Sequence, residues 1–294
     1  MSPLRLTLLT LLALSAFAAN SILCRMALGH HLIDPGRYTI VRLAAGAAML
    51  ALLARAWKGS WRAAFFLFLY ASPFSLAYVE LTTGTGALIA FGMVQLTMIG
   101  SSIVAGRHPS RLEWLGIVLA LAGLYWLVRP GLAAPPVTGA LLMATAGLGW
   151  GFYSLIGRGS SDPLRDTAGN FARASAMAVA AAFVLILLHH HLGVAAALAP
   201  FDGPANPSGY LLAAASGAIT SALGYVVWYA ALRGLTATRA ALVQTLVPVL
   251  SAVGGIALLG ERASWRLVVA GGLVLSGILL TLRPAPAVSS RRAP

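Results

Sequence analysis

The residues that could carry out chemistry are few, and their types favour binding over catalysis. Of the seven acidic residues, only Glu80 lies inside a long apolar stretch. The other six lie in loops or at the ends of expected helices, and the chain has no carboxylate pair, HExxH motif or glycine-rich phosphate loop. The histidines, including the run His189 to His191, fall at the edges of apolar stretches, where interfacial positions explain them better than metal ligation. We therefore expect no catalytic site, no metal site and no cofactor.

Several aromatic and amide side chains lie within apolar stretches, where they could line a cavity for a small molecule. Such pockets combine apolar walls with a few oriented polar groups. For any single aromatic residue, helix packing explains the position equally well. An unpaired amide is costly in hydrocarbon, so amides at this depth should face protein or water. The expected substrate-binding residues, some of them paired three apart on one helix face, are Phe17, Asn20, Tyr78, Phe91, Gln95, Trp150, Tyr153, Trp228 and Gln244.

A second candidate group, for gating, consists of charged residues and one proline. Glu80 approaches the end of one apolar stretch, and Arg42 and Arg25 are expected at a similar level on two others. Since a charge at membrane depth is normally paired, we expect Glu80 to pair with Arg42 or Arg25. The pair would be a structural latch, or alternatively Glu80 would be a proton-coupling carboxylate. Pro248, near the middle of a later stretch, should mark a kink or a cavity because proline removes a helical hydrogen bond.

The elements that would position these residues are membrane-spanning helices. The chain is 59% hydrophobic and 9% charged, with a mean hydropathy of +0.86, whereas soluble domains carry about 25% charged residues. Cys24 is the only cysteine, which excludes an internal disulfide. About ten apolar stretches are each long enough to cross ~30 Å of hydrocarbon, and they cover approximately residues 4–28, 38–56, 63–81, 84–105, 111–128, 137–156, 165–188, 208–232, 236–259 and 265–282.

Charge placement predicts the topology of these spans. The net charge of +13 does not indicate a nucleic-acid partner, because the basic residues lie mostly in short loops and at the ends of apolar stretches. An even number of spans puts both termini on one side, and fourteen of the 20 basic residues then lie on that side. The positive-inside rule therefore predicts cytoplasmic termini. The first 20 residues resemble a signal peptide, but their apolar stretch continues through Cys24, so we expect them to form the first span.

The two halves of the chain share a pattern at one constant offset. This shared pattern suggests that the chain consists of a first repeat at residues 1–132 and a second at residues 133–294, each with five spans. Because five is an odd number, the second copy would be inserted upside down relative to the first. Inverted repeats of this kind are typical of secondary transporters, which bind substrate near the membrane midplane. Chance similarity between alanine-rich helices is the alternative. The matched pairs include Gly106 and Gly260, Ser110 and Ser264, and Gly123 and Gly277.

These residues also carry a family resemblance that covers nearly the whole chain. The chain resembles the drug/metabolite transporter superfamily in its ten-span form with two EamA repeats, and within it the YddG-type exporters of aromatic and other amino acids. The second repeat carries the pattern closely, in Trp150 through Arg158, in the span with Pro248, and in Leu259-Gly260-Glu261-Arg262. The first repeat departs from it, with Phe17 in place of tryptophan, Val94 in place of proline and Arg107 in place of glutamate.

The resemblance implies an all-α membrane protein with ten helices around a central cavity that contains Trp150. It also implies alternating access and export from the cytoplasm across the bacterial inner membrane. We expect a secondary transporter of small amphipathic metabolites, above all aromatic and neutral amino acids, working in the lipid bilayer as a monomer or weak dimer. Multidrug or other metabolite efflux is the alternative, with uniport and proton antiport both open. A membrane-embedded enzyme would need an inward cluster of acids or histidines, and a scaffold would not need buried amides.

Overall fold

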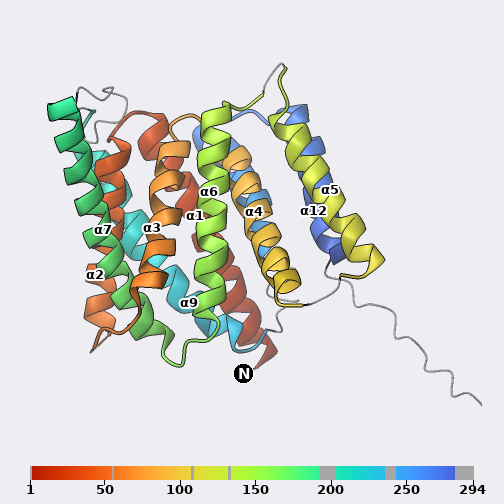
Figure 1. Ribbon diagram of the computed structural model, residues 1–294, viewed down its shortest axis with the longest axis horizontal. Coiled ribbons are helices and arrows are strands. Elements are labelled where there is room, and N and C mark those ends of the chain that lie inside the picture. Colours follow the sequence, from red (N-terminus) through yellow and green to blue (C-terminus); the bar gives the residue numbers. More distant parts are fainter. Residues whose placement is uncertain are drawn as a thin grey trace, which may run out of the picture.

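Helices that run side by side make up the described part of the protein (Figure 1). The computed structural model describes residues 2–54, 56–106, 109–131, 134–192, 203–235 and 243–281. Within these residues there is no β-strand, and the one isolated bridge joins Ile33 to Ala205. Arg107, the beginning of the expected ninth span at Thr236, and the side chains of His189 to His191 lie outside the described part.

The helices occupy the apolar stretches that the sequence predicts, with ends that differ by a few residues in most cases. Seven described segments are long and apolar enough to cross a membrane, namely residues 3–29, 35–53, 83–104, 111–128, 137–157, 163–188 and 207–232. In chain order the helices are α1 (Pro3–Gly29), α2 (Pro35–Leu53), α3 (Trp61–Ala77), α4 (Thr83–Val104), α5 (Arg111–Val128), α6 (Val137–Gly157), α7 (Pro163–Leu192), α8 (Pro207–Ala215), η2 (Ser216–Leu223), α9 (Gly224–Leu232), α11 (Leu246–Leu259) and α12 (Trp265–Thr281).

The surface of the bundle is apolar, as contact with lipid requires. Large hydrophobic side chains are exposed along the outer helices, for example Val118 and Tyr125 on α5 and Phe183 on α7. In water, exposed apolar area on this scale would cause association, whereas in a bilayer it is in contact with lipid tails. The helices also satisfy their own backbone hydrogen bonds, which a membrane span must do. The chain is therefore a multi-pass membrane protein.

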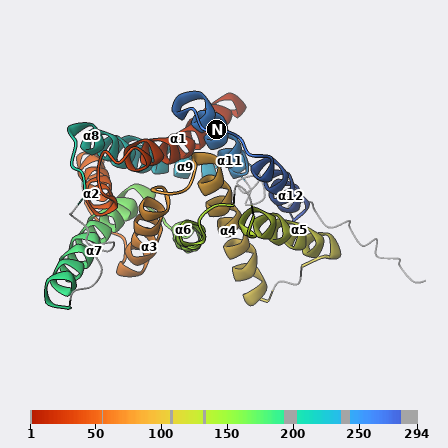
Figure 2. The ribbon, with the colours of Figure 1, turned by 90° about the horizontal axis from the view of Figure 1, so that it is seen from above.

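Pairs of helices from the two halves of the chain pack against each other. Figures 1 and 2 show α5 beside α12 at one edge of the bundle and α2 beside α7 at the other. Between these edges, α3 packs on α6 and α7, and α4 packs on α6 and α11. Helix α1 crosses the same region and contacts α11, α9, η2 and α8. The middle of the bundle is therefore bounded by helices from both halves.

The repeated turn has the same construction in both places. Gly106 and Gly260 end α4 and α11 with φ angles of +90° and +65°, a region that glycine adopts without strain. Four residues later, Ser110 and Ser264 begin α5 and α12, and each side-chain oxygen accepts a hydrogen bond from the backbone N–H three residues ahead. The sequence match therefore corresponds to a real similarity in local structure.

Two of the expected spans are interrupted. The eighth runs through α8 and α9 but contains the π-helix η2 between them, and π-helical turns inside α-helices often occur at functional sites. The ninth is broken at Thr245, so Pro248 lies in the first turn of α11 and not in the middle of a helix. The break has a direct cause, because the ring of a helical proline clashes with the carbonyl four residues back, here that of Gln244.

Candidate functional site

A small buried cavity lies in the middle of the bundle, where α1, α3, α4, α6, η2 and α9 meet. Its volume is about 20 Å³, which is room for about one water molecule. In this conformation the cavity is therefore closed to a solute larger than water. Its lining is formed by Phe17, Asn20, Ser21, Tyr70, Phe74, Ala90, Phe91, Val94, Gly147, Trp150, Thr220 and Tyr225.

Aromatic rings form most of the cavity wall, and Trp150 lies at their centre. Its ring centroid is 4.7 Å from that of Tyr225, 5.2 Å from Tyr70 and 5.8 Å from Phe17. Phe17 in turn packs edge-on against Trp228 at 5.7 Å. These separations are typical of favourable aromatic pairs. The indole nitrogen of Trp150 and the hydroxyl of Tyr225 are buried and have no hydrogen-bond partner among the described residues, so both polar groups are available to a ligand or a water molecule.

Asn20 joins the cavity to the π-helix by hydrogen bonds. Its amide nitrogen donates to the hydroxyl of Tyr70 at 3.1 Å. Its carbonyl oxygen accepts hydrogen bonds from Ser216 at 2.7 Å and, at 3.4 Å each, from Thr220 and Ser221. The amide is therefore satisfied by protein in the way that its depth in the membrane requires. Three hydroxyl groups of η2 thus reach one side chain.

Arg42 on α2 completes this network. Its Nη2 donates to the hydroxyl of Tyr70 at 2.9 Å and to Ser221 at 3.2 Å, and its Nε donates to Ser221 at 3.3 Å. The guanidinium carbon lies 5.0 Å from the ring centroid of Tyr70 and 5.1 Å from that of Phe74, both of which line the cavity. Arg42 is only 1% exposed. A full positive charge therefore lies beside the cavity wall.

Four expected binding residues lie elsewhere or reach the cavity only indirectly. Tyr153 packs against Trp150 at 5.7 Å but does not line the cavity. Trp228 and Gln244 line a second hollow of about 20 Å³ on the other side of Trp150, together with Arg158. Gln95 is buried on α4 but lines neither space. The structure thus brings Phe17, Asn20, Phe91 and Trp150 together at one cavity.

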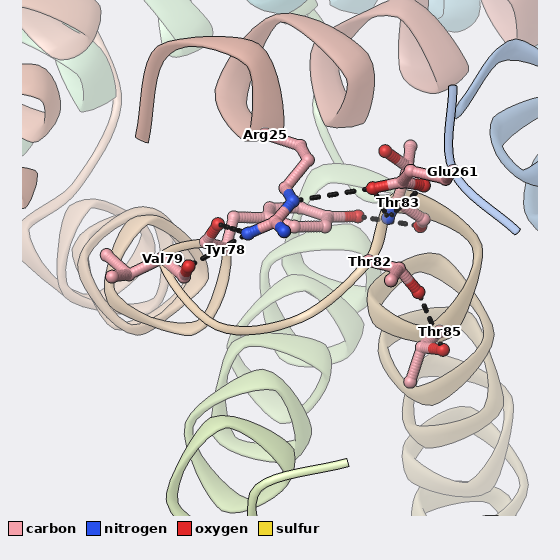
Figure 3. Close-up of polar contacts among 7 residues, drawn as sticks. All are labelled: Arg25, Tyr78, Val79, Thr82, Thr83, Thr85 and Glu261. Atoms are coloured by element: carbon pink, nitrogen blue, oxygen red, sulfur yellow. Dashed lines mark hydrogen bonds and ion pairs between the residues drawn. The ribbon is translucent and has the colours of Figure 1, made fainter. Parts of the chain in front are cut away.

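Tyr78, the remaining candidate, belongs to a polar cluster at the end of the bundle opposite the N-terminus. Figure 3 shows its centre, where Nε of Arg25 on α1 lies 3.3 Å from Oε1 of Glu261. Nη1 of Arg25 also donates to the carbonyl oxygens of Tyr78 and Val79 at 3.0 and 2.8 Å. Both oxygens of Glu261 accept from the backbone N–H of Thr83, at 3.0 and 2.9 Å. A carboxylate at a helix N-terminus is stabilising, so Glu261 both pairs Arg25 and caps α4.

The ion pair expected for Glu80 is not the one in the structure. Arg25 pairs with Glu261, Arg42 bonds to neutral hydroxyls, and Glu80 is exposed and pairs with neither arginine among the described residues. The reason is that α3 ends at Ala77, so Glu80 lies in the link to α4 at the surface and not inside a span. The acidic partner of Arg25 thus comes from the Leu259-Gly260-Glu261-Arg262 turn. We call the Arg25–Glu261–Thr83 cluster the latch.

Sequence reasoning missed the tyrosines and serines of the site. Tyr70, Tyr225 and Ser221 lie inside apolar stretches as the expected residues do, but nothing in the linear pattern separates them from packing residues. Glu261, the acidic partner of Arg25, lies in the second copy of the repeated turn, so the sequence singled out the turn but not this pairing. Glu261 becomes the partner of Arg25 only because α1 packs against α11 in the fold. The two residues of the ion pair are 236 positions apart in the sequence.

A bundle of apolar helices around an aromatic and polar cavity is the architecture of a multi-pass membrane transporter. The chain belongs to the EamA-like transporter family, whose model matches residues 137–283. This confirms the resemblance to the drug/metabolite transporter superfamily at the level of the family, which comprises transporters and not enzymes.

Two relatives and one solved structure are similar to the chain over most of its length. An uncharacterized protein of Pseudomonas aeruginosa is 48% identical over 287 residues, which cover 95% of both chains. An uncharacterized transporter of Archaeoglobus fulgidus is 25% identical over 215 residues, covering 71% of this chain and 70% of its own. A solved crystal structure is similar with a TM-score of 0.60 and 21% identity, covering 99% of this chain and all of the other, which supports the fold.

Proposed function

We propose that the protein is a secondary transporter that exports small amphipathic metabolites, above all aromatic and neutral amino acids, as the YddG-type members of its superfamily do. The observation that carries this proposal is the buried cavity around Trp150, in which an aromatic wall meets the Asn20–Tyr70–Arg42 network. Apolar walls with a few oriented polar groups suit a solute that has an apolar body and a polar end. A cavity between helices of both halves also suits alternating access.

The inverted-repeat arrangement is part of this proposal, and the α5–α12 contact supports it. A Cβ on Gly123 would come within 2.9 Å of the backbone nitrogen of Val274. A Cβ on Gly277 would come within 2.6 Å of the backbone nitrogen of Ala120. Under the constant offset between the halves, these two contacts are equivalent, with the roles of the helices exchanged. Ten spans arranged as two repeats, residues 1–132 and 133–294, would explain why α5 and α12 contact each other through equivalent residues.

The latch provides the gate on one side. With both termini in the cytoplasm, as the placement of basic residues favours, the latch closes the outer side of a bacterial inner-membrane carrier. On the inner side the counterpart of Arg25 is Arg158, which is exposed, and the counterpart of Glu261 in the sequence is Arg107. An arginine cannot form an ion pair with Arg158, so the sequence predicts no equivalent of the Arg25–Glu261 pair at these positions. The carrier should therefore rest closed to the outside.

Counterflow in proteoliposomes tests the proposed function. Purified protein is reconstituted with one unlabelled solute inside, and uptake of the labelled solute is followed for a panel of amino acids and cationic drugs. We expect exchange of aromatic and neutral amino acids above the level of protein-free liposomes. Exchange of drugs with no exchange of any amino acid would replace the proposal with multidrug efflux. A dependence on an imposed pH gradient would distinguish proton antiport from uniport.

A further inference from the structure

The buried charge of Arg42 has no negative partner among the described residues. Arg42 lies seven residues into α2, about 10 Å from the start of the helix at a rise of ~1.5 Å per residue. The titratable side chains near its guanidinium are those of Tyr70, Tyr225, Tyr38 and Cys24, which are neutral in their usual forms. Arginine itself keeps its charge under all physiological conditions. The site therefore has a net positive charge in the middle of an apolar bundle.

The hydrogen-bond donors of this network outnumber its acceptors. The guanidinium has five N–H donors, and those on Nε and Nη2 reach Ser221 and Tyr70. Nη1 is buried and has no partner within the described part of the chain. The hydroxyl of Tyr70 accepts from both Asn20 and Arg42, so its own hydrogen remains available to donate. Tyr70 lines the cavity, and the guanidinium with the unused Nη1 donor packs directly against the rings of Tyr70 and Phe74 in the cavity wall.

The carboxylates of the protein do not supply the missing acceptor. Every carboxylate in the described residues is either bonded to another group at the ends of the bundle or exposed there. Three form ion pairs: Asp34 with Arg37, Asp162 with Arg165 and Glu261 with Arg25. Of the others, Asp166 accepts hydrogen bonds from Gly59 and Ser160, Glu113 caps α5, and Glu80 is exposed. Burying an unpaired charge is costly, and intramembrane charges normally have a partner. The two aromatic rings beside Arg42 compensate only in part.

The backbone of Arg42 also packs closely against η2. A Cβ on Gly217 of η2 would overlap the carbonyl oxygen of Arg42, so the absence of a side chain there allows η2 to lie directly against α2. This close approach places Ser221 under the guanidinium. A group fixed in this way, with free donors, is preorganised to bind an anion.

We propose that Arg42 is the carboxylate-binding residue of the transport site, and that the substrates are small monocarboxylates with an apolar or aromatic body. The carboxylate accepts hydrogen bonds from Nη1 of Arg42 and the hydroxyl of Tyr70, while the body packs against Trp150 and Phe17. No described acidic residue lines the cavity, so the site needs a carboxylate in its substrate and does not need an amino group. This inference rests on the proposed transport function and narrows it.

Four compounds with the same aromatic body test the proposed transport function and the carboxylate-binding role of Arg42 separately, without any change to the protein. L-Phenylalanine has both charged groups, 3-phenylpropionate has only the carboxylate, and 2-phenylethylamine and L-phenylalaninamide have only the amine. Each is added as a competitor in proteoliposome counterflow of labelled L-phenylalanine, and binding to purified protein is followed by tryptophan fluorescence. We expect the two carboxylates to compete and bind, and the two amines to be at least 10-fold weaker. If none of the four competes or binds, the proposed function itself fails. If the amines match the carboxylates, transport stands and the role of Arg42 is wrong.

Variants then assign the carboxylate contact to Arg42. Arg42→Gln should weaken binding of 3-phenylpropionate about 10- to 100-fold, as expected for loss of a charged hydrogen bond, and Arg42→Lys should recover part of the loss. Arg62→Gln removes an exposed arginine and should bind as the wild type does. Because Arg42→Gln could fail to fold, Tyr70→Phe provides a second variant, for which a weaker effect in the same direction is expected. Unchanged carboxylate affinity in folded Arg42→Gln, or in Tyr70→Phe if Arg42→Gln does not fold, would overturn the proposal.

Discussion

Arg25 and Glu261 form an ion pair across the two halves of the chain, with Nε of the arginine 3.3 Å from Oε1 of the carboxylate. The same carboxylate accepts two hydrogen bonds from the backbone N–H of Thr83, which begins α4. One side chain therefore connects α1, α4 and the turn after α11. The proposed carrier would have to separate these helices in order to open, which makes this contact a specific target for mutation.

Neutralising Glu261 should open the latch. In Glu261→Gln the pairing with Arg25 is lost, and a loss of about 1.4 kcal/mol from the closed form would raise the open population about tenfold. The native Cys24 is buried next to Arg25 in the chain, so its rate of maleimide labelling reports the opening. We expect slow labelling in the wild type and labelling about ten times faster in the variant.

Glu80→Gln is the matched control for this experiment, since Glu80 is exposed and unpaired with either arginine among the described residues. Its labelling rate should match the wild type, and Cys24→Ser should not label. Faster labelling in Glu80→Gln, with no change in Glu261→Gln, would show that the latch has been assigned to the wrong acid.

Trp150 should be required for transport. Trp150→Ala removes the ring that contacts Phe17, Tyr70 and Tyr225, and truncation of a buried tryptophan costs about 3–5 kcal/mol. We expect counterflow to fall to the level of protein-free liposomes, with a lower thermal unfolding midpoint. Trp150→Phe should retain part of the counterflow activity and part of the thermal stability. Trp114→Ala on α5, where the side chain is 51% exposed, should leave counterflow unchanged, and a similar loss in both alanine variants would argue against a specific role.

The close packing of α5 against α12 should require glycine at position 277, which has no side chain. A Cβ on Gly277 would overlap the carbonyl oxygen of Gly116, so Gly277→Ala must push the helices apart, at a cost of about 1–3 kcal/mol. We expect a lower unfolding midpoint in detergent, measured by intrinsic fluorescence. Gly272→Ala lies on the same helix with nothing within 4 Å of the added carbon, and it should be neutral or slightly stabilising. Equal midpoints for the two variants would show that the close packing is not maintained in solution.

The amide of Asn20 should be needed to orient the network. Asn20→Ala removes one of the two donors to the Tyr70 hydroxyl and leaves Ser216 without its acceptor, and an unsatisfied buried polar group costs about 1–3 kcal/mol. We expect weaker substrate binding in fluorescence titrations, together with a lower unfolding midpoint. Thr7→Ala removes an exposed hydroxyl from the same helix and should change neither. Wild-type affinity in Asn20→Ala would place the amide outside the binding machinery.

Much of this architecture could be predicted from the sequence, because the bilayer imposes simple rules. A span must be apolar over about 20 residues and must satisfy its own backbone, so the helices could be placed from hydropathy. The turns at Gly106 and Gly260 were recognisable because positive φ favours glycine and a serine suits a helix N-terminus. Aromatic and amide residues within spans were also a partial guide to the cavity, since Phe17, Asn20, Phe91 and Trp150 line it and the other five expected residues do not.

The partners of these residues were decided by tertiary structure alone. The sequence indicated that Arg25 and Arg42 needed partners, but it could not indicate that α11 would bring Glu261 to Arg25 while α3 and η2 offered Arg42 only hydroxyls. Hydrophobic periodicity determines which segments form helices. The pairing of charges depends on which helices touch and at what height, and that is determined by the close approach of backbones at residues such as Gly217.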